Sequence, residues 1–237
     1  MIRLNLIAGP RNISTALMYS FAQRTDTAVL DEPFYACYLY ITGLNHPGKD
    51  EVLKSQSIYA EEVSTSVFAN RGKPILFIKN MAHHLEVMEQ TFLEKVTNIF
   101  LIRDPKQILA SYAQVIETPN LRDIGIEYQF NLFHRLKAQG QDPIIMDSSL
   151  VLENPASVLK QVCERIGISF STDMLQWPAG PKPYDGIWAK HWYSNVHKSS
   201  GFEKQATSNR PLPAHLHRQN EIAQYYYAEL APFCVQP

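Results

Sequence analysis

The sequence contains little cysteine and no long hydrophobic run, and each shortage excludes a class of protein. Its three cysteines, Cys37, Cys163 and Cys234, form no CxxC pair, so neither a disulfide framework nor a structural zinc site is expected. No stretch approaches the roughly 18 uninterrupted apolar residues that a transmembrane helix requires. The opening residues MIRLNLIAGPRN hold too short an apolar run for a secretory leader. These features predict a cytoplasmic protein.

An excess of charge of either sign is also missing. Lys and Arg total 22 against 23 Asp and Glu, which gives a formal net charge of −1. A chain with this balance has no overall field that attracts nucleic acid or an anionic membrane, so neither is expected as a partner. Any anion that the protein binds must therefore be held by local groups. The oligomeric state stays open.

Repeats and low-complexity runs are absent, and the 45% hydrophobic content over 237 residues is enough for one large domain, predicted to span residues 1–237. Aliphatic runs alternate with helical segments, and each run is continuous, as in strands buried on both faces of a parallel sheet. The runs are residues 2–8, 27–30, 75–78, 97–102 and 143–146. This order predicts an α/β fold in three layers, α/β/α, around a parallel sheet.

Helix starts and irregular segments can also be located. An N-cap residue followed by proline predicts helices after Asp104 and Asn154, and a final helix is expected from about 218 to 230. Residues 43–57 are polar and rich in turn formers, and aromatic-rich loops are expected at 34–44 and 184–202. The Pro- and Gly-rich region 171–213 predicts a long irregular loop or lid, because long loops inside compact domains tend to be functional.

The first strand runs into a short turn and then into a helix expected to begin near Ala16. A strand, a turn and a helix N-terminus present backbone N–H groups and a positive dipole end, which favour a phosphate. Arg11, Ser14 and Thr15 add side-chain donors. The Walker A pattern GxxxxGK[ST] is not met, because counting from Gly9 its last three positions hold Ser14, Thr15 and Ala16. The turn is therefore either an anion site without a P-loop lysine or merely the cap of the first helix.

A second candidate anchor lies at the end of the fourth run. Its last residues lead into Arg103, and the following helix carries Ser111, eight positions further on. Ligands bind at the carboxyl ends of strands in doubly wound folds, so Arg103 is expected to project into the site, with Ser111 about two turns into the next helix. The two could hold one phosphate. The alternative is an ion pair between Arg103 and Asp104 beside a solvated serine.

Both motifs resemble those of the sulfotransferases. The turn PRNIST at 10–15 is similar to that family's 5′-phosphosulfate loop, P[KR]SGTT, with departures at Asn12 and Ile13. The stretch IFLIRDPKQILASY is similar to the family's 3′-phosphate element, and residues 144–167 resemble its following strand–helix element. The resemblance implies a P-loop NTPase-like sulfotransferase fold and 3′-phosphoadenosine 5′-phosphosulfate as co-substrate. The residues that it implies as donor contacts are Pro10, Arg11, Asn12, Ile13, Ser14, Thr15, Arg103 and Ser111.

Sulfuryl transfer needs a base for the acceptor and cationic donors for the transferred group, and it needs no metal. In some carbohydrate and tyrosyl-protein sulfotransferases, a glutamate in the place corresponding to Glu32 is associated with base catalysis. Cytosolic members carry a catalytic histidine in a loop comparable to the one that holds Lys79 and His83. The resemblance therefore implies Glu32 or His83 as base, with Arg11 and Lys79 as charge stabilisers. In the plainer alternatives, Glu32 pairs with an arginine and one of His83 and His84 packs at a helix start.

The C-terminal loop of sulfotransferases carries basic residues and glycine and closes over the 3′ side of the nucleotide. The stretch 188–202 is similar in type and place, which implies Lys198, Ser199 and Gly201 as phosphate ligands. Trp188 and Trp192 could stack on adenine or on the acceptor. The alternative is a loop pinned to the core by its tryptophans. The histidines of the C-terminal region lack the spacing of a metal-ligand set, so no metal site is expected.

Two other functions stay open. The first is a P-loop small-molecule kinase that uses Mg-ATP, with Asp31 on the metal and Glu32 positioning the nucleophile. The missing Walker A lysine argues against it. The second is a non-catalytic nucleotide-binding protein, suggested by the departures at Asn12 and Ile13. As a sulfotransferase, the chain would bind a nucleotide donor and a small-molecule or carbohydrate acceptor of open identity.

Overall fold

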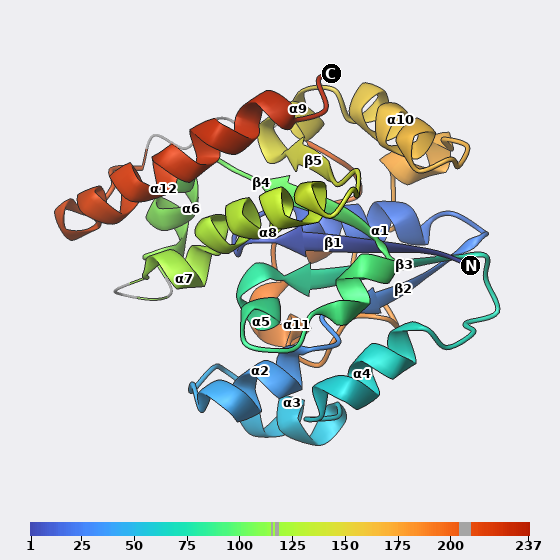
Figure 1. The fold of residues 1–237 in the computed structure, drawn as a ribbon, viewed down its shortest axis with the longest axis horizontal. Coiled ribbons are helices and arrows are strands. Elements are labelled where there is room, and N and C mark those ends of the chain that lie inside the picture. Colours follow the sequence, from blue (N-terminus) through green and yellow to red (C-terminus); the bar gives the residue numbers. More distant parts are fainter. Residues whose placement is uncertain (115, 117–118, 204–209) are drawn as a thin grey trace.

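The computed structural model describes residues 1–114, 116, 119–203 and 210–237, and it centres on a parallel sheet (Figure 1). The five strands of this sheet lie in the order β2-β3-β1-β4-β5. They are β1 (Ile2–Ala8), β2 (Thr27–Asp31), β3 (Ile75–Met81), β4 (Thr97–Ile102) and β5 (Ile144–Asp147). Every run predicted as a strand is a strand, although β2, β3 and β5 end one to three residues later than predicted.

The helices of the described residues follow the strands along the chain. The α-helices are α1 (Ser14–Ala22), α2 (Tyr35–Thr42), α3 (Lys49–Ser55), α4 (Ala60–Val67), α5 (Ala82–Glu86), α6 (Pro105–Tyr112), α7 (Leu121–Ile124), α8 (Ile126–Ala138), α9 (Ser148–Glu153), α10 (Pro155–Arg165), α11 (Ala189–Trp192) and α12 (His217–Leu230). The short 3-10 helices are η1 (Thr91–Lys95), η2 (Thr172–Leu175), η3 (Val196–Lys198), η4 (Ala214–Leu216) and η5 (Ala231–Phe233). Among the described residues, no helix combines the length and apolarity that crossing a membrane requires.

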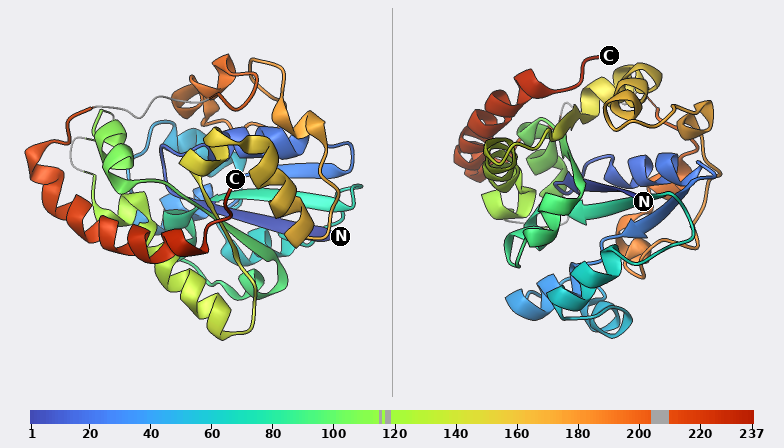
Figure 2. Two further views of the ribbon diagram at one scale, coloured as in Figure 1. Left: turned by 90° about the horizontal axis from the view of Figure 1, so that it is seen from above. Right: turned by 45° about the vertical axis from the view of Figure 1, so that its right-hand side comes forward.

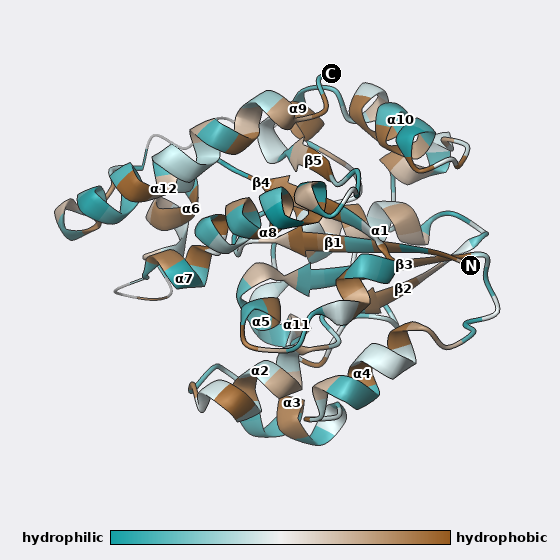
Figure 3. Cartoon of the chain, viewed as in Figure 1, coloured by the Kyte–Doolittle hydropathy of each residue, from teal (hydrophilic) through white to brown (hydrophobic). Residues whose placement is uncertain are grey.

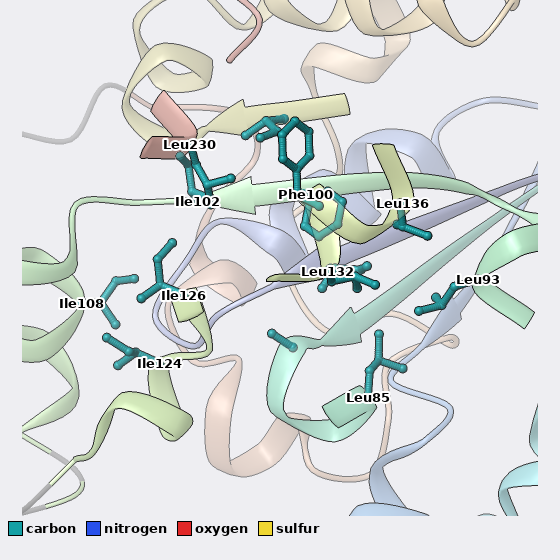
Figure 4. Close-up of a cluster of buried hydrophobic side chains, with 14 of the residues drawn as sticks. Leu85, Leu93, Phe100, Ile102, Ile108, Ile124, Ile126, Leu132, Leu136 and Leu230 are labelled. Atoms are coloured by element: carbon teal, nitrogen blue, oxygen red, sulfur yellow. The ribbon is translucent and has the colours of Figure 1, made fainter. Parts of the chain in front are cut away.

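Helices cover both faces of the sheet, which confirms the three-layer α/β/α fold (Figure 2). In β4, Phe100 and Ile102 join the core cluster that contains residues of α8 and α12 (Figure 4), whereas Ile99 and Leu101 pack with residues of α1 and α10. Successive side chains of a strand point to opposite faces, so burial on both faces needs a continuous apolar run. Figure 3 shows the difference between strands and surface helices: the strands are mainly hydrophobic, whereas α8 and α12 carry both hydrophobic and hydrophilic residues.

The predicted helix starts are confirmed by their caps. The side chain of Asp104 accepts a hydrogen bond from the Lys106 N–H at 2.9 Å, and that of Asn154 accepts one from the Ser157 N–H at 3.1 Å. In both helices the residue after the cap is a proline, whose missing N–H costs nothing at that position. The predicted final helix is α12.

Two predictions about local structure were wrong. The first helix starts at Ser14 rather than near Ala16. Residues 34–44 are mainly the helix α2, whose side chains from Tyr35 to Leu39 are buried, so it shows no polar face to mark it as a helix. The polar segment 43–57 contains α3, whose acidic first turn and basic last turn suit the helix dipole. The described part of region 171–213 is irregular apart from η2, α11 and η3, and residues 204–209 lie outside the described residues.

Candidate active site

A cleft of about 530 Å³ opens at the carboxyl ends of the strands. It gathers every residue that the sulfotransferase resemblance implied as base, charge stabiliser or phosphate ligand. These residues are Pro10, Arg11, Asn12, Ile13, Ser14, Thr15, Glu32, Lys79, His83, Arg103, Ser111, Lys198, Ser199 and Gly201. They come from the turn after β1, the start of α1, the ends of β2, β3 and β4, the helices α5 and α6, and the segment 188–202, here called the C-terminal segment. The site is therefore assembled from segments far apart in the sequence.

The turn after β1 is held in a tight path. A Cβ atom at Gly9 would lie 2.4 Å from the carbonyl oxygen of Ile124, so only glycine fits there. Arg11 adopts a φ of 55°, a left-handed conformation that a side chain makes costly. Asn12 donates from Nδ2 to the Leu101 carbonyl at 3.0 Å, and its Oδ1 accepts from the Ile13 N–H at 2.9 Å. The departure at Asn12 therefore fastens the turn to the end of β4.

The N-terminus of α1 faces the cleft with Ser14, Thr15 and Ala16. The N-cap residue is Ile13, and no side chain of the described residues caps this helix end. The first N–H groups of a helix lack intrahelical partners and lie at the positive end of the dipole. An anion bound in the cleft would supply the missing acceptors.

Two arginines meet beside this helix end. Arg103 donates from Nη1 to the backbone carbonyl of Arg11 at 2.7 Å and from Nη2 to Gln107 at 3.1 Å. Arg11 donates from Nε to the Ser111 hydroxyl at 3.1 Å. Burial, and next the charge of Arg11, lowers the pKa of Arg103. We call Arg11, Arg103, Ser111 and the N-terminus of α1 the cationic half of the cleft.

The alternative prediction paired Arg103 with Asp104, but the hydrogen bonds of the Asp104 carboxylate go to other groups. The Asp104 Oδ1 accepts from the Lys106 N–H at 2.9 Å and from the Gln224 side chain at 2.6 Å. These bonds fix the start of α6 and its contact with α12. Arg103 thus keeps its guanidinium at the cleft, where it lines the same space as Ser111.

A buried cluster of two carboxylates and one ammonium lies at the ends of β2 and β3. The Lys79 ammonium donates to Asp31 at 2.9 Å, to Glu32 at 2.5 Å and to the Tyr193 hydroxyl at 2.6 Å, which uses all three of its N–H groups. Tyr193 donates to Asp31 at 2.7 Å, and the Gly186 N–H donates to the same carboxylate at 3.0 Å. Asp31 is therefore saturated by protein groups, whereas Glu32 also lines the cleft.

The environment of this cluster changes the proton affinities of its members. Burial raises the pKa of Glu32; the charge of Lys79 opposes this, and that of Asp31 adds to it. Burial acts to lower the pKa of Lys79, but the two carboxylates outweigh it and the pKa is raised. Glu32 also has a φ of 38°, a strained conformation of the kind that gathers at functional sites. A carboxyl group with a raised pKa that lines a cleft is a stronger base than an ordinary carboxylate, which suits proton transfer.

The adjacent histidines His83 and His84 are both buried and both line the cleft. The alternative in which only one of them belongs to the site is therefore not supported. The Nδ1 atom of His84 lies 3.8 Å from Oε2 of Glu32, too far for a hydrogen bond. Neither His83 nor His84 has a hydrogen-bond partner for Nδ1 among the described residues. Burial lowers the pKa of His83 to about 3 and that of His84 well below its usual value. Both rings are therefore neutral at neutral pH.

The C-terminal segment closes one side of the cleft and is tied to the rest of the protein. Gly201 pairs with Gln176 in an isolated β-bridge, and the Trp177 indole donates to the Ser199 hydroxyl at 3.3 Å. Trp192 lines the cleft, as its predicted stacking role requires. The same prediction for Trp188 was wrong, because this side chain is only 2% exposed and packs in the core, with its indole N–H donating to Tyr193.

Sequence reasoning missed several residues of the cleft, among them Tyr35, His46, Tyr112 and Tyr193. Tyr193 is 162 residues away from Asp31 along the chain, and no local pattern links the two. Tyr35 lies in a segment predicted as a loop. A signal was present only for Tyr193, which belongs to the polar-aromatic stretch at 188–202.

The chain belongs to the sulfotransferase domain family, whose model matches residues 2–229. It is also 36% identical over 208 residues to each of two Arabidopsis thaliana proteins, branched-chain-amino-acid aminotransferase-like proteins 1 and 2. The match covers 87% of this chain but only 37% of either relative. This chain therefore corresponds to little more than a third of each of those proteins.

Solved sulfotransferases share the fold. The sulfotransferase domain from the Synechococcus PCC 7002 olefin synthase matches with a TM-score of 0.61 at 17% identity, over 96% of this chain and 94% of that one. A mouse sulfotransferase complexed with PAP matches with a TM-score of 0.50 at 11% identity, over 96% and 84% of the two chains. The family model confirms the resemblance inferred from short motifs, and these structures share its fold.

Proposed function

We propose that this protein transfers a sulfuryl group from 3′-phosphoadenosine 5′-phosphosulfate to a hydroxyl or amine of a small acceptor. The observation that carries the proposal is the meeting, in one cleft, of the cationic half with the carboxyl group of Glu32. The first provides N–H and guanidinium donors for an anionic donor molecule, and the second provides a base for the acceptor.

The residues of the cationic half suit a nucleotide that carries phosphates at the 5′ and 3′ positions of its ribose. The turn Pro10, Arg11, Asn12, Ile13, Ser14 and Thr15 would hold the 5′-phosphosulfate, with Arg103 and Ser111 on the 3′-phosphate. Burial and the charge of Arg11 lower the pKa of Arg103, and a bound anion would relieve that repulsion. The similarity in fold to a mouse sulfotransferase complexed with PAP supports the same ligand class. Lys198, Ser199 and Gly201 would close over the nucleotide.

The transfer would proceed in one displacement. Glu32 takes the proton of the acceptor hydroxyl or amine, and the freed electron pair forms a bond to sulfur. The bond from sulfur to the bridging oxygen of the 5′-phosphate breaks, and its electrons stay on that oxygen in adenosine 3′,5′-bisphosphate. Arg11 and the N–H groups at the start of α1 would stabilise the charge on the transferred group. Lys79 would act through Glu32, because its N–H groups are bound to the cluster.

Glu32 is the better candidate base of the two that the sequence suggested. Burial raises the pKa of Glu32, which makes it a stronger base than an ordinary carboxylate, whereas a pKa of about 3 makes His83 a weak base. His83 would instead shape the acceptor side of the cleft. The Mg-ATP kinase alternative loses support, because Asp31 is occupied by Lys79, Tyr193 and the Gly186 N–H.

Calorimetric titration in the presence of EDTA tests the donor site. We expect adenosine 3′,5′-bisphosphate to bind at least about tenfold more tightly than adenosine 5′-monophosphate, because only the first reaches Arg103 and Ser111 with a 3′-phosphate. A parallel titration in magnesium buffer without EDTA measures Mg-ATP, and a preference for Mg-ATP over the bisphosphate would overturn the proposal in favour of a kinase. Release of the bisphosphate from the sulfated donor, measured over a panel of hydroxyl and amine acceptors, tests the transfer itself. Tight binding without release would favour a non-catalytic nucleotide-binding protein.

A further inference from the structure

The part of the cleft at the ends of β2 and β3 is lined and backed by aromatic rings. Tyr35 stacks on His84 with ring centroids 4.6 Å apart, and Tyr38 lies against the same imidazole at 4.7 Å. His83 meets His84 edge to face at 4.5 Å. His46 shares a hydrogen bond of 2.8 Å with the Tyr35 hydroxyl. We call these five residues, which come from α2, α5 and the segment after α2, the ring half of the cleft.

The imidazoles of the ring half carry no positive charge at neutral pH. Burial is the main cause in all three, and it lowers the pKa of His46, of His84 and, to about 3, of His83. Nearby positive charges lower these pKa values further. Lys49 acts on His46, Arg122 on His83 and Lys79 on His84. Histidine therefore supplies no counter-charge for an acidic ligand.

The cations near the ring half are engaged with protein groups. Lys79 lies between Asp31 at 2.9 Å and Glu32 at 2.5 Å, so this buried cluster has one carboxyl group more than it has ammonium groups. At the rim, Arg122 forms an ion pair of 2.7 Å with Glu86.

Two further charges act at the rim. The ammonium of Lys49 donates to the Gly43 carbonyl at 2.7 Å, on the exposed side. The negative charge of Asp123 acts on the rings, because it contributes to raising the pKa of Tyr38, Tyr112 and, against burial, His46. The carboxyl groups around the ring half therefore leave it more suited to a cation than to an anion.

We propose that the acceptor bound by the ring half is a ring compound that bears a protonated amine, and that the site discriminates against compounds that bear a carboxylate. This inference rests on the proposed sulfotransferase function of the cleft. An ammonium group gains from the aromatic rings that line the cleft, Tyr35 among them, and from the nearby carboxyl groups. A carboxylate in the same place would lose its water, and the described cations that act on these imidazoles, Lys79, Lys49 and Arg122, are already held by protein groups. A bound donor in the cationic half adds negative charge and strengthens the same preference.

Three phenols of nearly equal size test the proposal, because they differ mainly in the charge of the side chain. They are tyramine, 2-(4-hydroxyphenyl)ethanol and 4-hydroxyphenylacetate, titrated into the protein saturated with adenosine 3′,5′-bisphosphate. We expect tyramine to bind at least about tenfold more tightly than 4-hydroxyphenylacetate, with the neutral alcohol between them. Equal or reversed affinities overturn the proposal, and so does an absence of measurable tyramine binding at about 5 mM.

Variants locate the source of the preference. Glu32→Gln is expected to narrow the ratio of the tyramine and 4-hydroxyphenylacetate affinities, since it removes a carboxyl group of the buried cluster. Glu164→Gln is the matched control, because Glu164 is exposed on α10 and should leave the ratio at its parent value. A ratio that does not respond to Glu32→Gln removes the cluster as the cause.

Titration with the bisphosphate alone distinguishes a failure of this inference from a failure of the proposed function. If the parent protein does not bind the bisphosphate but shows the expected order of phenols without it, the proposed function fails and the charge preference stands. If the bisphosphate binds and the phenols show no order, the charge preference fails and the proposed function stands.

Discussion

The guanidinium of Arg103 donates a 2.7 Å hydrogen bond to the backbone carbonyl of Arg11, a residue 92 positions earlier in the chain. Arg11 in turn reaches Ser111 at 3.1 Å. The turn after β1, the end of β4 and the helix α6 are thereby joined into one structure before any ligand binds. Preorganised donors of this kind lose little conformational entropy on binding an anion.

The first prediction concerns these two arginine contacts. Arg103→Ala removes a charged donor of the proposed 3′-phosphate site and a bond that holds the turn, so we expect adenosine 3′,5′-bisphosphate to bind roughly 100-fold more weakly. Ser111→Ala removes a neutral donor and should cost about tenfold. Calorimetric titration measures both.

Arg165→Ala is the matched control for the arginine variant. Arg165 forms an exposed ion pair of 2.9 Å with Asp142 at the end of α10, and its loss should leave bisphosphate affinity within about twofold. Parent affinity in Arg103→Ala would remove this residue from the donor site.

The second prediction concerns the pH dependence of transfer. A base must be ionised to accept a proton, and burial holds the pKa of Glu32 above its usual value of about 4.3. The rate should therefore fall as the pH drops through this raised pKa. Glu32→Gln should lower kcat by about 10² to 10⁴ and remove that acid limb, with bisphosphate affinity kept. A Glu32→Gln protein that keeps the parent rate and profile refutes the assignment.

The third prediction concerns Tyr193 as a positioning residue. Its hydroxyl donates to Asp31 at 2.7 Å and lies 3.4 Å from Glu32, where it helps to lower the pKa of that carboxyl group. Tyr193→Phe should therefore move the acid limb of the rate profile to higher pH. Tyr226→Phe serves as the control, since the Tyr226 hydroxyl bonds Glu127 at the exposed surface. A purely structural role for Tyr193 would lower activity without moving the limb.

The cationic half could be predicted from the sequence because each of its signals is local. The turn residues are contiguous, and Arg103 and Ser111 are separated by one strand end and two helical turns. What these signals could not show is the fastening of the turn by Asn12, whose partner Leu101 is 89 residues away. A residue that departs from a family pattern is informative only once its contacts are known.

The ring half could not be predicted, for two physical reasons. Its helix α2 is buried over most of its length and shows no polar face, so periodicity gave no sign of it. Its contacts also join distant segments, as where Tyr35 stacks on His84. The sequence did place His83, His84 and Lys79 after a strand, and this much is enough to bring them to the cleft.

The fourth prediction concerns stability at acid pH. His83 has a pKa of about 3 in the folded protein and about 6.5 when unfolded, so between these values only the unfolded chain takes up the proton. Stability is therefore lost as the pH falls below 6.5. From pH 7 to pH 5 the contribution of His83 is about 2 kcal/mol. Denaturant unfolding of His83→Gln should show a loss smaller by about that amount, whereas His134→Gln, at an exposed site, should behave as the parent. Parallel losses in parent and His83→Gln would contradict the prediction.

The fifth prediction concerns the one glycine that the turn after β1 requires. In Gly9→Ala the added Cβ would lie 2.4 Å from the carbonyl oxygen of Ile124, a backbone atom that cannot turn aside. The turn must therefore move, and we expect bisphosphate affinity to fall by at least about tenfold, with a loss of about 1 to 3 kcal/mol in unfolding free energy. Gly72→Ala is the control, because its φ is +71° and its Cβ would meet no described atom within 4 Å. It should cost about 1 kcal/mol of stability and leave binding unchanged. Unchanged binding in Gly9→Ala would mean that the path of the turn does not set the donor site.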